Sequence, residues 1–109
     1  MLLTVNQDNN HTVLTAVGEI DLSTSGQLDS AVVEALGQQT AHLTLDLSQV
    51  TFLDSSGLGV IVKALKRAKE SNTTFDVVAA NERVLKVFNL TGLAEVIEIY
   101  STLDGIPGQ

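Results

Sequence analysis

The sequence contains no cysteine, a single proline and few aromatic residues. The lack of cysteine excludes disulfide bonds, thiolate metal sites and cysteine nucleophiles, and it leaves the redox compartment undetermined. No apolar run is long enough for a signal peptide or a membrane span, because Lys63 ends the longest run, over 58–62. We therefore expect a cytoplasmic protein that does not act at a membrane.

Basic residues are also scarce, and they are unevenly placed. Six Lys and Arg residues stand against 13 Asp and Glu residues, which gives a formal net charge of -7. All the basic residues lie between Lys63 and Lys86, so one segment alone offers a positive patch. Aromatic residues do not alternate with this patch, and the net charge is unfavourable for nucleic acid. We therefore expect no nucleic-acid partner.

What is present fits one compact domain. The 109 residues are 44% hydrophobic and 17% charged, and the mean hydropathy is +0.24. Such a chain has enough apolar residues to build one core and too many to remain disordered. We expect a single domain over 1–109, with a weakly ordered C-terminal end over 100–109, where glycine and proline gather.

Hydrophobic periodicity predicts an α/β fold, a mixed sheet of four to five strands with helices packed on it. Alternating patterns indicate strands over 2–5, 12–20, 43–47, 75–79 and 96–100, and 50–53 is a second short apolar run after the third strand. Helical spacing indicates helices over 25–36, 57–70 and 82–90. The first two strands form a hairpin, and the strands on either side of the second helix pair in parallel.

Capping signals set the predicted helix ends. Thr24 with Gln27 fits a capping box at the first helix, and Gly37 fits the position just after it. Asn81 is an N-cap residue for the third helix, which Gly92 ends. In the second helix the residues predicted to face the core are Leu58, Ile61, Val62, Leu65 and Ala68.

The residue inventory gives little support to an enzyme. His11 and His42 are the only histidines, and each begins a strand beside polar residues, so we expect both to be solvated. Ser55 has Leu53 where a hydrolase nucleophile needs glycine. The glycines at 57 and 59 lack the third glycine of a dinucleotide loop, because position 62 is valine.

Acidic residues at strand ends raise the possibility of a metal site. Asp21, Asp46 and Asp54 each close a strand or precede a helix, so their carboxylates could converge at one sheet edge. A role in a turn or a cap explains each of them more simply, Asp46 in particular. We expect no metal and no cofactor.

Ser55 stands where a helix begins, with glycines directly after it. Free backbone N–H groups and the helix dipole stabilise an added anion at such a position by about 0.3–1 kcal/mol. The same serine, or Ser56, could equally serve only as the N-cap. These residues alone favour the N-cap interpretation.

Several segments resemble the STAS domain, specifically the anti-sigma factor antagonist family of bacterial partner-switching systems. The central segment is DSSGLGV at 54–60, preceded by LDLS at 45–48 and VTFL at 50–53. GEID at 18–21 resembles the first motif of the family, and FNLTGL at 88–93 resembles its late helix and turn. The resemblance spans nearly the whole chain and keeps the order of the elements.

The resemblance implies a regulator, not an enzyme. In that family the serine after the motif aspartate is phosphorylated by a kinase that is itself the anti-sigma factor, which implies Ser55, with Ser56 as the neighbouring alternative. Asp21 and Asp54 match the acidic positions around that serine, and Gly57 follows it. The unphosphorylated protein binds the kinase and frees the sigma factor, and a PP2C-type phosphatase restores it after phosphorylation.

Small residues on the second helix are expected to allow close docking of this partner. The expected partner-binding residues are Asp21, Ser23, Asp54, Ser55, Gly57, Gly59, Val60 and Lys63. A monomer or a weak dimer is expected. The alternatives are a STAS scaffold or a small-ligand or nucleotide-binding module without a phosphoswitch, and an aspartate-metal phosphotransfer protein such as a receiver. Against the receiver, no lysine follows Lys86.

Overall fold

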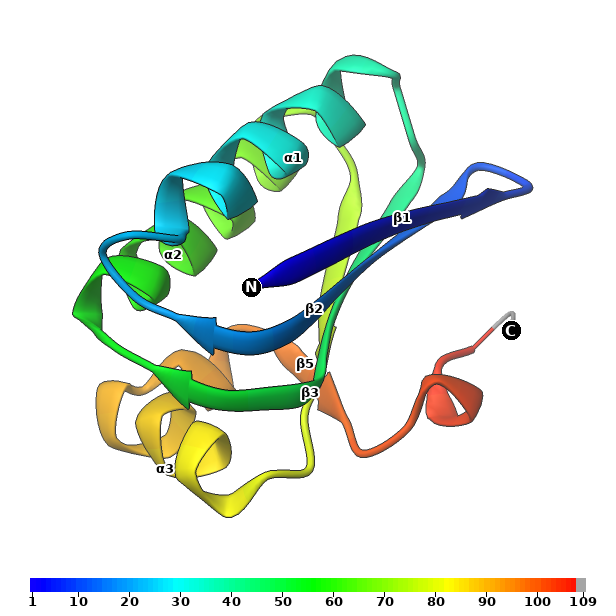
Figure 1. Cartoon of the computed structure of the whole chain (residues 1–109). Helices are drawn as coiled ribbons and strands as arrows, with labels where there is room; N and C mark the ends of the chain where they lie inside the picture. The colour runs from blue at the N-terminus through cyan, green and yellow to red at the C-terminus, as the bar shows by residue number, and fades with distance from the viewer. Residues whose placement is uncertain (108–109) are drawn as a thin grey trace.

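The computed structural model describes residues 1–107 and shows one five-stranded sheet with helices on both faces (Figure 1). The strands are β1 (Leu2–Asp8), β2 (His11–Ile20), β3 (His42–Leu53), β4 (Thr74–Val78) and β5 (Glu98–Tyr100). The helices are α1 (Ser25–Gly37), α2 (Ser55–Glu70) and α3 (Glu82–Thr91). Short 3-10 turns cover Leu93–Glu95 and Leu103–Gly105. No helix within the described part is long and apolar enough to cross a membrane.

The strands lie in the sheet in chain order, from β1 to β5. β1 and β2 form an antiparallel hairpin, and the other neighbours pair in parallel. The predicted hairpin and the parallel pairing around α2 are therefore confirmed. The hairpin turn is shorter than predicted because Asn9 and Asn10, both at positive φ, close it alone.

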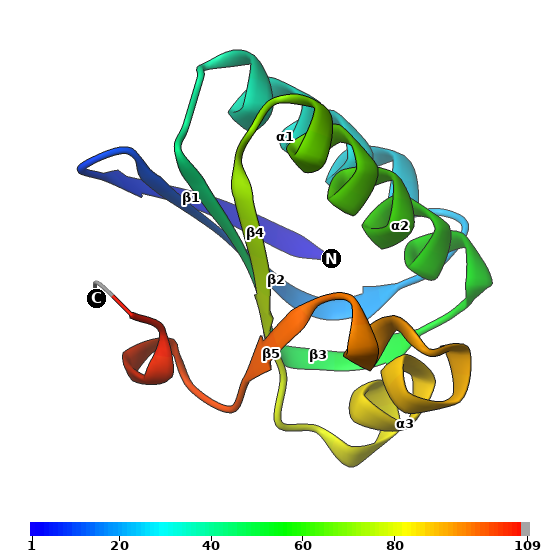
Figure 2. The ribbon, with the colours of Figure 1, turned by 180° about the vertical axis from the view of Figure 1, so that it is seen from behind.

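Helices α1 and α2 lie side by side on one face of the sheet, and α3 covers the other face (Figures 1 and 2). The alternating residues of β2 and β3 pack under α1 and α2, which places Leu14, Leu45 and Ile61 in the core without solvent exposure. Because parallel strands β2 and β3 end at the same sheet edge, the turns that follow them lie next to each other. Asp54 N donates to Ile20 O across these turns, at 3.2 Å.

The two runs predicted at 43–47 and 50–53 form one continuous strand, β3, so the predicted break is wrong. The register against β2 shifts between Thr15 and Val17 and again between Gly18 and Glu19, which places extra residues on β3. Asp46 supports the first irregularity, since its carboxylate accepts a hydrogen bond from Ser48 N at 3.0 Å. Bulges let the ladder continue through residues that interrupt the alternation.

The two predictions for the ends of α1 hold only in part. Thr24 is the N-cap residue, as predicted, but its hydroxyl makes no capping bond; it accepts from Asp21 N at 2.9 Å and donates to Glu19 O at 3.1 Å, so it closes the preceding turn and the predicted capping box is wrong. Gly37 is the last helical residue, and the left-handed residue is Gln39. The signals on α3 are confirmed, because Asn81 caps Arg83 N and Gly92 has a φ of 80°.

The end of the chain packs on the domain. The last strand, predicted over 96–100, is shorter in the structure: it is β5, because Val96 ends a 3-10 turn and is exposed. After β5, the side chain of Ile106 is only 2% exposed. The predicted weak order over 100–109 stays a prediction, and residues 108 and 109 lie outside the described residues.

Candidate functional site

The start of α2 is organised around the carboxylate of Asp54. Its Oδ1 accepts hydrogen bonds from Ser56 N at 2.9 Å and Gly57 N at 3.1 Å, and the Ser56 hydroxyl donates to it at 2.5 Å. These bonds, the Ser56 hydroxyl first, lower the pKa of Asp54 below its ordinary value. Asp54 is therefore the N-cap of the helix and a negative charge at neutral pH.

The structure separates the two candidate serines. Ser56 is half-buried, and its hydroxyl is bound to Asp54. Ser55 is exposed, and its hydroxyl forms no hydrogen bond with any residue in the described range 1–107. A kinase can therefore reach the Ser55 hydroxyl without breaking the cap.

One expectation about this site holds only in part. Of the N–H groups at the start of α2, those of Ser56 and Gly57 are not free to receive a phosphate, because the Asp54 carboxylate already binds them, whereas Ser55 N forms no hydrogen bond among the described residues. The serine alone does not reveal this, since the competing acceptor is the side chain of the residue before it. An anion on Ser55 would meet the Asp54 carboxylate and not an empty helix terminus.

A second acidic turn lies next to the first. Asp21 Oδ1 accepts from the Ser23 hydroxyl at 2.6 Å and Ser23 N at 3.0 Å, and the Thr24 hydroxyl lies 3.2 Å away. The Ser23 hydroxyl is the main cause of the lowered pKa of Asp21. The Leu22 N–H contributes to the lowered pKa of Asp54, so the β2–α1 turn reaches the α2 cap. Asp21, Ser23, Asp54 and Ser55 therefore belong to one surface.

Part of the predicted docking face on α2 is wrong. Val60 is only 6% exposed, whereas Val62, predicted to face the core, is exposed. The buried face of α2 consists of Gly57, Val60, Ile61, Ala64 and Ala68. Four of the five residues predicted to face the core do so: Ile61 and Ala68 are buried, and Leu58 and Leu65 pack half-buried against it. Only Val62 is misplaced, because the buried face is turned away from it and toward Gly57, which packs against the sheet.

Gly57 is required by internal packing. A Cβ atom at this position would lie 2.6 Å from side-chain carbons of Ile20 and Leu53, so any side chain would force these two side chains or α2 to shift. Gly59 is different, because no atom would lie within 4 Å of its Cβ. Of the predicted helix residues, Gly59 and Lys63 remain accessible.

Two exposed apolar side chains near this surface were not among the predicted site residues. Leu22 is 82% exposed in the turn beside Asp54, and Phe52 is exposed near the end of β3. Leucine in a polar turn is the signal that points to Leu22. Phe52 gives no such signal, because an aromatic residue in a strand is ordinarily buried.

The predicted solvation of both histidines is wrong. His11, His42, Thr44 and Asp76, here called the histidine cluster, come together from β2, β3 and β4. Asp76 accepts from the Thr44 hydroxyl at 2.5 Å and lies 2.5 Å from His42 Nε2, while His11 Nε2 lies 2.7 Å from Thr44 Oγ1. The imidazole rings stack with centroids 3.9 Å apart. Burial first, and then His42, lower the pKa of His11.

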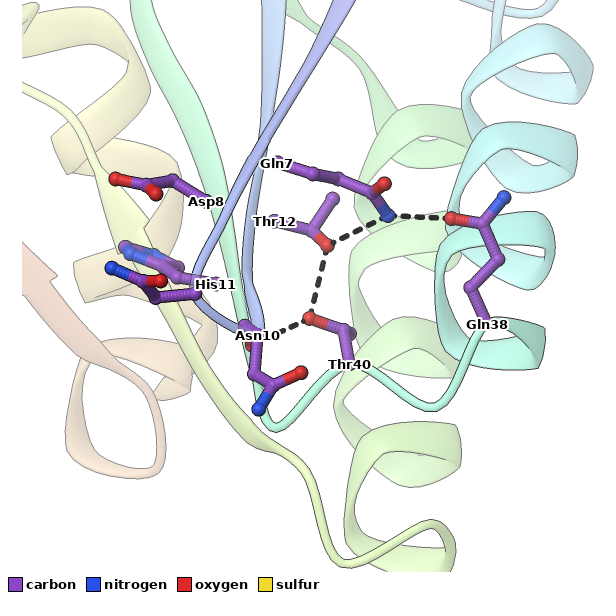
Figure 3. A pocket seen from close by; sticks show the side chains of 8 residues that line it. Gln7, Asp8, Asn10, His11, Thr12, Gln38 and Thr40 are labelled. Atoms are coloured by element: carbon purple, nitrogen blue, oxygen red, sulfur yellow. Dashed lines mark hydrogen bonds between the residues drawn. The ribbon is translucent and has the colours of Figure 1, made fainter.

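The described residues offer no set of side chains for a metal ion, and the polar pocket beside the β1–β2 turn offers none for the phosphates of a nucleotide. Within residues 1–107 no group of three or more acidic or histidine side chains could hold a metal ion, and Asp46 is occupied at the β3 irregularity. A polar pocket of about 240 Å³ lies beside the β1–β2 turn (Figure 3). Its side chains bind one another, from Gln7 to Thr12 and from Thr12 to Thr40, and its lining contains no lysine or arginine for a phosphate.

Comparison with known proteins agrees with this geometry. The STAS domain family matches residues 3–106. The anti-sigma-B factor antagonist of Bacillus subtilis is 33% identical over 101 residues, which cover 93% of this chain and 92% of that protein. The anti-sigma-F factor antagonist RsfB of Mycobacterium tuberculosis is 35% identical over 107 residues, 97% of this chain and 87% of that protein.

A solved structure shows the same architecture. The crystal structure of an anti-sigma factor antagonist from Mycobacterium paratuberculosis superposes with a TM-score of 0.88 at 30% identity, over 94% of this chain and 87% of that one. The resemblance stated from the central motif is thereby confirmed along the whole described domain. The chain belongs to the STAS domain family and, within it, to the anti-sigma factor antagonists.

Proposed function

We propose that this protein, when unphosphorylated, binds an anti-sigma factor that is also a serine/threonine kinase, and so releases a sigma factor. Phosphorylation of Ser55 by that kinase ends the binding, and a PP2C-type phosphatase restores it. The relatives are named as antagonists of anti-sigma factors, and proteins of this family are regulators and not enzymes. The cycle takes place in the bacterial cytoplasm.

The contrast between two neighbouring hydroxyls carries the proposal. Ser56 uses its hydroxyl to bind Asp54, so its phosphorylation would break that bond and place a doubly charged phosphate directly against the N-cap carboxylate of α2. Ser55 is exposed, and phosphorylation there breaks no hydrogen bond among the described residues. Ser55 is therefore the acceptor that the fold leaves available.

Electrostatic repulsion explains how the phosphate ends the binding. A phosphoserine adds about -1.5 to -2 charges at neutral pH. On Ser55 this charge lies beside Asp54 and close to Asp21, whose lowered pKa values keep both carboxylates ionised. The N–H groups of Ser56 and Gly57, which could otherwise neutralise part of this charge, are already bound to Asp54. Every ~1.4 kcal/mol of lost interaction weakens binding about tenfold, so the partner need lose few contacts.

The partner surface consists of exposed residues on the two turns and on the first turns of α2. Ser23 and Leu22 come from the β2–α1 turn, and Ser55, Gly59 and Lys63 come from α2. Leu22 supplies the apolar contact that an interface centre needs, and Lys63 supplies a flanking charge. Gly57 and Val60 act from below this surface, by setting the position of α2 against the sheet.

The test is phosphorylation by the anti-sigma kinase with ATP, mapped by mass spectrometry. We expect one phosphate on the wild type, one on Ser56→Ala, and none on Ser55→Ala. Ser56→Ala is the matched control, because it removes the adjacent hydroxyl. Wild-type modification of Ser55→Ala would refute the assignment. Phosphorylated protein that still binds the kinase as tightly as before would refute the switch.

A further inference from the structure

The two edges of the sheet differ in how well they are protected from pairing with another strand. β5 is three residues long, carries the exposed acid Glu98, and is followed by the segment that buries Ile106. β1 is seven residues long, pairs only with β2, and lies open at the edge of the sheet (Figure 1). Its outward backbone N–H and C=O groups therefore have no strand partner among the described residues.

β1 also lacks the devices that normally keep an edge strand single. Its sequence is LLTVNQD, without lysine, proline, glycine or a bulge, and its one charge, Asp8, stands at the last position. Exposed edges without such residues are templates for pairing with another chain. In a protein with a net charge of -7, an exposed strand whose single charge stands at its end is where a second copy meets the least repulsion.

We propose that the protein forms a symmetric homodimer by antiparallel pairing of β1 with β1 of a second copy, which joins the two sheets into one. The twofold axis requires that one residue of β1 faces itself. When the whole strand is paired, that residue is Val5, Leu2 lies opposite Asp8, and Thr4 lies opposite Asn6. The two Asp8 carboxylates are then about 20 Å apart, so the only charges on the strands do not face each other.

The side chains on β1 fit this register. Val5 lies on the same face as Leu3, toward α1, and is 59% exposed beside Ala31 and Glu34. Pairing would bring the two Val5 side chains into contact over the axis and remove both from water. The remaining acids of the two copies repel each other at longer range, so the dimer should tighten as salt is added.

Sedimentation equilibrium over a wide concentration range is the first test. We expect the wild type to dimerise and Val5→Lys to weaken the dimer at least about tenfold, because it puts two like charges on the axis. Val96→Lys is the control: it makes the same change at a position that is 55% exposed and far from β1 in the sheet order. Far-UV circular dichroism must show all three proteins folded.

A crosslinking test then examines the register. Because the chain has no cysteine, an oxidised Val5→Cys variant should form a disulfide-linked dimer, whereas Leu2→Cys should not, since its two copies would lie about 20 Å apart. A wild type that stays monomeric at its highest soluble concentration would overturn the proposal, as would equal dimerisation of Val5→Lys and Val96→Lys. Equal crosslinking of both cysteine variants would overturn the register. β1 carries no phosphorylation-site residue, so these results leave the test of Ser55 independent.

Discussion

Two aspartate-centred networks in this protein differ in how they are made. Asp54 receives its hydrogen bonds from residues two and three positions along the chain, at an exposed helix start. Asp76 interacts with His42 and Thr44, which are 34 and 32 positions away in the chain, and Asp76 is buried, with 3% of its surface exposed. The comparison shows that the local network forms a site open to a partner, whereas the long-range network joins strands.

The largest effect is expected from removing the carboxylate of the histidine cluster. Asp76→Ala leaves Thr44 and His42 without their buried acceptor, so we expect the free energy of unfolding to fall by about 3 kcal/mol. Urea unfolding measures this change. Asp104→Ala, on an exposed acid, is the control and should change little. Equal losses for both variants would mean that the histidine cluster does not stabilise the fold.

The next effect tests the packing under the Asp54 network. Gly57→Ala places a methyl group 2.6 Å from Ile20 and Leu53, and we expect a loss of about 1–3 kcal/mol. Gly59→Ala makes the same change in open space two residues later and should gain up to about 1 kcal/mol from helix propensity. Thermal unfolding compares the two variants. A Gly57→Ala protein as stable as the wild type would show that α2 does not need this close contact.

A smaller free-energy change is expected when charge is added at the exposed site. Ser55→Glu places an acid beside Asp54, and we expect binding of the anti-sigma kinase to weaken at least about tenfold, or ~1.4 kcal/mol. Isothermal titration calorimetry measures the affinity. Ser30→Glu adds the same charge on the exposed part of α1 and serves as the control. If both variants bind alike, the net charge and not the position of the charge governs the partner.

Acid titration should separate the two networks by pH. The pKa of His11 lies below its ordinary 6.5 in the folded protein, so the unfolded chain binds more protons and stability falls as the pH drops below about 6.5. The lowered pKa values of Asp21 and Asp54 affect the free energy of unfolding only at lower pH, where stability falls as the pH drops below about 3.8. Urea unfolding across these ranges should show the first step disappear in His11→Asn. A first step that persists in this variant would assign it to another group.

Local signals predicted the parts of the fold that depend on neighbours in the chain. The alternation in β2, the helical spacing of α1 and the caps Asn81 and Gly92 are interactions within a few residues, and they appear as predicted. The prediction was wrong where a residue had two local uses. Thr24 is the N-cap residue, but its hydroxyl closes the preceding turn and makes no capping bond to α1, and Val62 fits the helical period of α2 but lies outside its buried face.

The candidate site divides in the same way. The motif Asp54-Ser55-Ser56-Gly57 was sufficient to place the candidate phosphorylation site at a helix start, because the resemblance and the capping pattern are properties of consecutive residues. The choice between Ser55 and Ser56 needed the bond from Ser56 to Asp54, and the role of Gly57 needed the position of Ile20 and Leu53. These contacts depend on where α2 sits on the sheet.

The amino-acid pattern alone was enough for the α/β class, the absence of thiol chemistry and the family resemblance, since each follows from composition or from residues close together in the chain. Folding in three dimensions decided which hydroxyl is free, which face of α2 is buried, and that the half-buried His11 and His42 stack on each other while His42 binds the buried Asp76. The physical reason is that burial and long-range hydrogen bonds arise only when strands distant in the chain become neighbours. The acidic residues therefore have a definite arrangement: two ionised carboxylates lie beside Ser55, and the strand at the open edge of the sheet carries a single charge, at its end.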